Sequence, residues 1–224
     1  MKKGLILLLG LIFSLSSHAL SSYEASYDLY INKIDTNIHL GNAEFKLEIN
    51  DETYTYTSSA SVRPLLSIFY NYSRDEKSSG LILNQQLISN YYKLFEHTDD
   101  SVDIDFEINI STEQNLSMIG EAKVVDELSL YLALSQDINN QPDQKVFTYQ
   151  VAGSEGITPQ NFTVLGNETI EINGEEVQTI KIECLELRLT LNLSEAHDYL
   201  PVLIKKTNGK SLFHLILTDY RKQP

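Results

Sequence analysis

The sequence predicts a mainly β fold with curved antiparallel sheets and one or two short helices. The sheets are expected to form an open barrel, a half-barrel or a sandwich. Three observations predict this class. Apolar and polar residues alternate with a period of two in several segments, as in strands with one wet face. Asn-Gly pairs, which favour tight hairpin turns, stand between such segments, and only two segments have helical spacing.

The alternation is clearest in four segments, at residues 23–31, 43–49, 102–110 and 185–193. In the last of these, Leu occupies every odd position from Leu185 to Leu193. Just before it, Ile180 and Ile182 occupy even positions. A one-residue offset exchanges the two faces of a strand, so we expect a turn or bulge near Cys184.

Hairpin turns are expected at Asn173-Gly174 and Asn208-Gly209, where Asn-Gly suits the two central positions of a type I′ turn. Asn50-Asp51 is a weaker turn signal. The tetrad Gly153-Ser154-Glu155-Gly156 superficially resembles a hydrolase nucleophile elbow, but its spacing and flanks do not fit that motif. We interpret it as a polar turn.

Helical spacing occurs at two places. Asp126 can cap a helix that runs through Ser135, with Leu128, Tyr131, Leu132 and Ser135 on one face. Pro64 can begin a short helical turn that continues to Phe69. The helix and polar loop at 126–145 divide the strands into two groups. We expect one continuous β-rich domain over residues 20–224, with its strands in two sheet regions divided near 126–145, over the alternative of two independent domains.

The first 19 residues have the three parts of a secretory signal peptide. Lys2 and Lys3 precede an apolar run at 4–15, and the small residues Ser17 and Ala19 follow it. The run is too short to span a bilayer as a helix. Cleavage between Ala19 and Leu20 is predicted, which leaves a soluble periplasmic protein of bacterial type; secretion from the cell is not excluded.

Composition limits the partners. With 17 Lys+Arg against 31 Asp+Glu, the formal net charge of -14 argues against binding to nucleic acid or to anionic membrane surfaces. Cys184 is the single cysteine, so no intramolecular disulfide can form, and its apolar neighbours predict a buried thiol.

No catalytic, cofactor or metal motif is recognisable. The sequence has no His-Glu-x-x-His pair, no phosphate loop and no dinucleotide fingerprint. His197-Asp198 and His214 are interpreted as surface residues. The carboxylates at 99–107 and at Glu175-Glu176 are interpreted as solvated faces, since a calcium loop spacing is absent. We expect no enzymatic activity, no cofactor and no metal.

The order of elements resembles bacterial exported proteins grouped as domain of unknown function 3108. The segments that carry the resemblance are a leading strand at 23–30, Gly41 to Leu47, a Tyr/Thr/Ser-rich strand, a short helix at 65–70, Ser78 to Ile82, Asp126 to Leu134, Phe147 to Val151 and Tyr199 to Ile204. The resemblance covers about residues 23–220 and implies a periplasmic, mostly antiparallel β protein without established activity. Members often carry an aromatic near Thr190–Leu193, and this chain has no Trp.

The sequence is compatible with three functions. The first is a non-catalytic protein that binds an apolar or amphipathic envelope molecule, with the 185–193 face and the tyrosines at 23–30, 54–56 and 91–92 lining a pocket. The same faces would equally well form only a core. The second is an envelope interaction or scaffold protein that uses sheet edges or its acidic surface. The third, favoured least, is a hydrolase of an envelope polymer.

Overall fold

The structure is a computed structural model that describes residues 20–33, 36–64, 66–67, 71–84, 86–98, 102–110, 123–208 and 211–223. The predicted signal peptide and Ala19 lie outside the described residues, and Leu20 is the first residue within them.

The described elements are, in chain order, β1 (Tyr23–Lys33), β2 (Thr36–Asn50), β3 (Thr53–Val62), β4 (Tyr72–Leu83), β5 (Gln86–Thr98), β6 (Ile104–Asn109), β7 (Lys123–Asp126), α2 (Ser129–Asn140), β8 (Val146–Gly153), β9 (Gly156–Ile172), β10 (Glu175–Cys184), β11 (Leu189–Ser194), the 3-10 helix η1 (Glu195–His197), β12 (Leu200–Asn208) and β13 (Ser211–Lys222).

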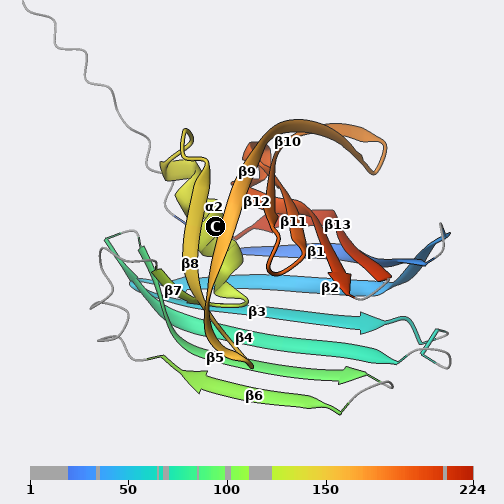
Figure 1. Ribbon diagram of the computed structural model, residues 1–224, viewed down its shortest axis with the longest axis horizontal. Coiled ribbons are helices and arrows are strands. Elements are labelled where there is room, and N and C mark those ends of the chain that lie inside the picture. Colours follow the sequence, from blue (N-terminus) through green and yellow to red (C-terminus); the bar gives the residue numbers. More distant parts are fainter. Residues whose placement is uncertain are drawn as a thin grey trace, which may run out of the picture.

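All 13 of these strands belong to one sheet, in the order β6-β5-β4-β3-β2-β1-β13-β12-β11-β10-β9-β8-β7. Every neighbouring pair is antiparallel except β7 and β8, which are parallel. The sheet is strongly curved and does not close on itself (Figure 1). The predicted class, a curved antiparallel β fold with few helices, is confirmed, and the two sheet groups are joined by the pairing of β1 with β13.

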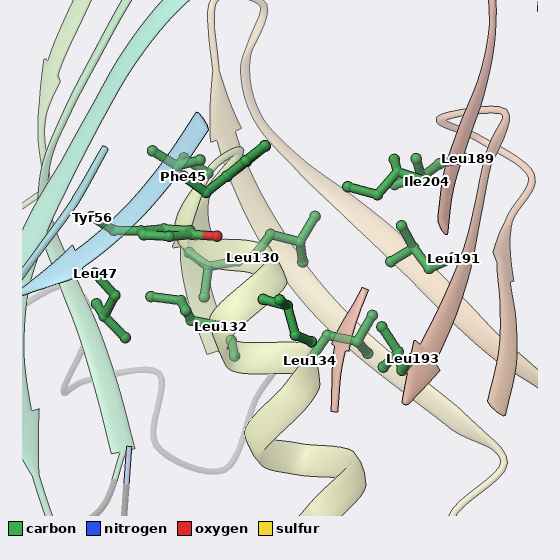
Figure 2. Packing of buried hydrophobic residues seen from close by; sticks show 14 of the residues in the cluster. Phe45, Leu47, Tyr56, Leu130, Leu132, Leu134, Leu189, Leu191, Leu193 and Ile204 are labelled. Carbon is green, nitrogen blue, oxygen red and sulfur yellow. The ribbon is translucent and has the colours of Figure 1, made fainter. Parts of the chain in front are cut away.

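We call β1–β6 the first wing and β8–β13 the second wing. Helix α2 lies in the space between them (Figure 1). Figure 2 shows Leu130, Leu132 and Leu134 of α2 between the two wings. On one side they face Phe45, Leu47 and Tyr56, and on the other side they face Leu189, Leu191, Leu193 and Ile204.

The helix is more buried than its predicted single face implies. Leu130, Ala133, Leu134 and Ile138 are buried in addition to the expected Leu128, Leu132 and Ser135, while Tyr131 is only partly buried. Leucine, alanine and isoleucine side chains point to more than one side of this helix and need a core on each of those sides, which the two wings supply. The helix also continues five residues beyond Ser135, to Asn140.

The turns follow the sequence signals with two corrections. Asn173 and Gly174 have φ values of 53° and 83°, as a type I′ turn requires. Asn208, by contrast, pairs with Ser211 inside the sheet, so the connection is at residues 209–210, outside the described residues.

The second correction concerns the segment after Cys184. The expected turn is present, but it occupies residues 185–188, and the strand begins only at Leu189. Leu185 is consequently 74% exposed rather than part of a buried face. The helical turn expected to begin at Pro64 is present in the described residues, because the amides of Leu66 and Ser67 both donate to the Arg63 carbonyl. Residues 65 and 68–70 lie outside the described part of the chain.

Candidate ligand-binding groove

A cavity of about 520 Å³ opens between the two wings above the beginning of α2. We call it the groove. Most of its lining is apolar, and the apolar residues come from both wings and from the helix. These are Leu29, Ala43, Phe45, Ala60, Leu130, Val151, Leu187, Leu189, Ile204, Phe213 and Leu215.

Small side chains on the first wing leave space for the groove. Ala43 of β2 pairs directly with Ala60 of β3, and Ser58 precedes Ala60 by two residues on the same face. Residues two apart on a strand point to the same side, so three short side chains stand where long ones would fill the space. The groove is therefore a consequence of residue size at these positions.

Charged side chains form one wall of the groove. In the register of the sheet, Ala60 pairs with Arg74 of β4, and Arg74 pairs with Glu96 of β5. Arg74 forms ion pairs with Glu96 at 2.6 Å, with Glu76 at 2.9 Å and with Glu127 at 3.1 Å. We call Arg74, Glu76, Glu96 and Glu127 the charged wall.

Glu76 is the most enclosed member of the charged wall, with a side chain that is 9% exposed. Its carboxylate also accepts hydrogen bonds from the Tyr92 hydroxyl at 2.7 Å and from the Ser58 hydroxyl at 3.0 Å. Burial acts to raise the pKa of Glu76, but Arg74, Tyr92 and Ser58 together hold that pKa below its usual value. Burial acts to lower the pKa of Arg74, and Glu76 reverses this effect, so Arg74 and Glu76 are both ionised at neutral pH.

Glu127 reaches the wall from the turn that precedes α2. Its side chain passes over Gly153 at the end of β8, where an added Cβ atom would collide with the Glu127 carboxylate. The glycine thus leaves room for Glu127 to reach Arg74 on the opposite wing.

Asp126 holds the beginning of α2 in place, as the sequence predicted for a capping residue. Its Oδ1 accepts hydrogen bonds from the backbone amides of Leu128 at 2.9 Å and Ser129 at 2.8 Å. Its Oδ2 accepts the hydroxyls of Ser78 at 2.6 Å, Ser129 at 2.7 Å and Ser89. Ser78 lies on β4 and Ser89 on β5, so this carboxylate ties the helix to the first wing.

A second cavity, of about 190 Å³, lies beside η1 and is lined in part by Leu20 and Tyr23. Asp198 and Tyr199, which follow η1, have φ values of 55° and 58°. The Asp198 carboxylate accepts hydrogen bonds from the Tyr220 hydroxyl at 2.6 Å and from Lys222 at 2.9 Å. These contacts hold the backbone in a conformation that non-glycine residues rarely adopt.

The expected tyrosines do not line the groove, although Tyr23 lines the second cavity. Tyr27, Tyr54, Tyr56 and Tyr92 lie in the core and do not line the groove. Leu187 and Leu189 do line it, whereas Leu191 and Leu193 pack in the core. The aromatic hydroxyls at the groove come instead from Tyr72 and Tyr131.

The charged wall was not predicted from the sequence. A signal was present, because Arg74 and Glu76 stand two residues apart and therefore share one face of a strand. Glu96 and Glu127 gave no such signal, since sheet pairing and the turn before α2 bring them to Arg74.

The histidines are dispersed. His97 pairs with Asp103 at 2.7 Å, and His197 lies 3.2 Å from the Ser194 hydroxyl. His214, expected on the surface, is 9% exposed and lies 2.8 Å from the Asn37 side chain. Within the described ranges no three His, Cys, Asp or Glu residues gather in a way that could hold a metal ion.

Among the described residues, the cysteine, the paired carboxylates and the Gly153–Gly156 tetrad are not part of the groove lining. Cys184 is buried, as expected, and burial raises the pKa of its thiol. Asp105 and Glu107 are exposed on β6, while residues 99–101 lie outside the described residues. Glu175 and Glu176 are exposed beside the turn at Asn173, and Ser154-Glu155 forms the turn between β8 and β9.

No family model matches the chain, and no curated protein matches it. The resemblance to domain of unknown function 3108 therefore stays a prediction. Among solved structures, the chain is similar to a beta-barrel-like protein of domain of unknown function DUF1849 from Brucella abortus. The two share 9% sequence identity with a TM-score of 0.51, over 92% of this chain and 99% of that one. This likeness concerns the fold alone.

Among the helices that the structure describes, none has the length and apolar character needed to cross a bilayer.

Proposed function

We propose that this chain is an exported, non-catalytic periplasmic protein that binds an amphipathic molecule in the groove. The observation that carries the proposal is the groove itself, which combines a mostly apolar lining with one charged wall. Ligand sites typically combine apolar walls with a few polar groups that fix orientation. The apolar chain of the ligand would replace water along the alanines and leucines of the groove. The polar head of the ligand would face the charged wall.

Two features favour a binding role for the groove over a gap left by packing. Its volume lies within the range of sites that hold small molecules, about 300–1,000 Å³. Its polar wall is also tied together by hydrogen bonds and ion pairs, so it is ordered before any ligand arrives. Preorganised polar groups reduce the cost of binding.

The test begins with native mass spectrometry of protein exported with its own leader, before and after organic extraction. We expect a mature chain that begins at Leu20 and carries an extra mass that extraction removes. An empty chain that also fails to take up an apolar dye after extraction would contradict the proposal.

A pair of variants distinguishes binding in the groove from binding elsewhere on the protein. Ala60→Leu extends a side chain into the groove and should abolish the extra mass while the protein remains folded. Ser59→Leu adds the same side chain on the exposed face of β3 and serves as the matched control. Equal ligand content in the two variants would place the ligand elsewhere.

A further inference from the structure

The charged wall carries more negative than positive charge at the groove. Arg74 faces the carboxylates of Glu76, Glu96 and Glu127. Glu76 is enclosed, but the side chains of Glu96 and Glu127 are 20% and 35% exposed. Two carboxylates are thus accessible from the groove beside one guanidinium.

Arg74 is poorly placed to receive an anion. Its Nη1 donates to Glu96, and its Nη2 donates to both Glu76 and Glu127. A carboxylate or phosphate head would have to displace one of these acids and would then lie beside the others. Like charges at such distances repel strongly in a partly desolvated site.

Positive charge elsewhere in the groove does not reverse this balance. Among the described lining residues, Lys206 is the other cation; it is exposed and lies on β12 of the second wing. His214 also belongs to the lining, but burial and Lys205 lower its pKa, which favours the neutral ring. The net charge of -14 over the whole chain favours the approach of cations over anions.

We infer that the groove selects a cationic amphipath, with an apolar chain along the alanine and leucine lining and an N–H-bearing cation, such as a primary amine, against Glu96 and Glu127. This inference rests on the proposed function, because it names the chemical class of the ligand for the same groove. An ammonium head donates hydrogen bonds to carboxylates, and charge-assisted bonds of this kind are stronger than neutral ones.

The experiment uses three ligands with one chain length and different heads: decylammonium, decanol and decanoate. Each is titrated below its micelle concentration into the mature, extracted protein at neutral pH, and displacement of the neutral dye N-phenyl-1-naphthylamine is measured. We expect decylammonium to bind roughly tenfold or more tightly than decanol, and decanoate to bind most weakly. The preference should shrink as salt is added, because the rim of the site is solvated.

Variants assign the preference to the wall. Glu127→Gln and Glu96→Gln should each reduce the affinity for decylammonium toward that for decanol, with a clearly larger effect on decylammonium than on decanol. Glu107→Gln, on the exposed face of β6, is the matched control and should change neither affinity.

The outcomes separate the two proposals. If decanoate binds as tightly as decylammonium, or if Glu127→Gln weakens decanol equally, the groove remains a ligand site but the inference about its cationic head is wrong. If the dye and all three ligands fail to bind, the proposed function fails together with the inference.

Discussion

Two enclosed carboxylates in this protein are held in different ways. Asp126 is completely buried and is held only by neutral donors, namely three hydroxyls and two backbone amides. Glu76 borders the groove, and its partners are a guanidinium and two hydroxyls. The difference shows how one wing serves two purposes. Neutral donors join the helix to the sheet where water is excluded, whereas ion pairs shape the wall that water and a ligand can reach.

The largest expected effect comes from removing the buried junction. Asp126→Ala removes the carboxylate that accepts the hydroxyls of Ser78 and Ser89 and the amides at the start of α2, so it should lower the free energy of unfolding by about 3–5 kcal/mol. Urea denaturation measures this change. Asp105→Ala, on the exposed face of β6, is the control. A loss below about 1 kcal/mol in Asp126→Ala would show that the junction contributes little.

A smaller effect is expected at the groove. Glu76→Gln removes one charge but leaves Arg74 with Glu96 and Glu127, so the loss of unfolding free energy should be about 1–2 kcal/mol. Glu44→Gln on the exposed side of β2 controls for charge. If Glu76→Gln were as damaging as Asp126→Ala, the distinction between a sealed junction and an accessible wall would be wrong.

The two carboxylates should respond to pH with opposite signs. Burial raises the pKa of Asp126 above its ordinary value of 3.8, so its ionised form is disfavoured in the folded state. Its contribution to stability should therefore decrease as pH rises from about 3.8 through the raised value. The pKa of Glu76 is lowered despite its burial, so its contribution is present above its ordinary value of 4.5 and is lost as pH falls through the lowered one.

Urea denaturation of wild type, Asp126→Asn and Glu76→Gln across acidic pH checks these signs. The unfolding free energy of wild type minus that of Asp126→Asn should increase on acidification. The unfolding free energy of wild type minus that of Glu76→Gln should decrease. The total change over this pH range amounts to at most about 1.4 kcal/mol for every unit by which the folded and unfolded pKa values differ. Slopes of the same sign would refute the comparison.

The smallest effect is expected for Gly153→Ala. The new methyl group displaces the end of a flexible Glu127 side chain, so the cost in unfolding free energy should be about 1 kcal/mol or less. The ion pair between Glu127 and Arg74 should nevertheless be lost, and decylammonium binding should change while decanol binding does not. Gly156→Ala is an informative comparison, because an added Cβ there meets no neighbour, although its φ of 104° disfavours alanine.

The sequence was sufficient for the fold class because alternation and turn residues are local signals. Asp126 was likewise recognisable as a cap, and the hairpin at Asn173 was located to the residue. The pairing of β1 with β13 could not be predicted, because it joins the two ends of the sequence, as when Tyr23 pairs with Lys222, and no local pattern links them. Leu187 and Leu189 lie in the pocket-lining segment that the sequence predicted, but the first-wing side of the groove was not predicted, because it depends on Ala43 and Ala60 becoming neighbours, which only the strand register determines.

The tyrosine hypothesis erred for a different physical reason. Tyrosine in an alternating strand predicts a face, but it does not say whether that face meets a ligand or another part of the protein. Here the hydroxyls are satisfied inside the core, as when Tyr23 donates to Tyr56 at 3.0 Å and Tyr27 donates to the carbonyl of Pro201 at 2.7 Å. A buried tyrosine with an internal partner has no need of a ligand.

The strand order also determines when the whole sheet can form during folding. Eleven of the twelve neighbouring strand pairs join consecutive strands, and the exception, β1 with β13, lies at the centre of the sheet. A circular permutant that began at β7 and ran from β13 through a short linker into β1 would make every pair consecutive. Because folding slows as contacts become more distant along the chain, this permutant should fold faster than the natural order. In the natural chain, the two wings can pair through β1 and β13 only once β13, the last strand, is available.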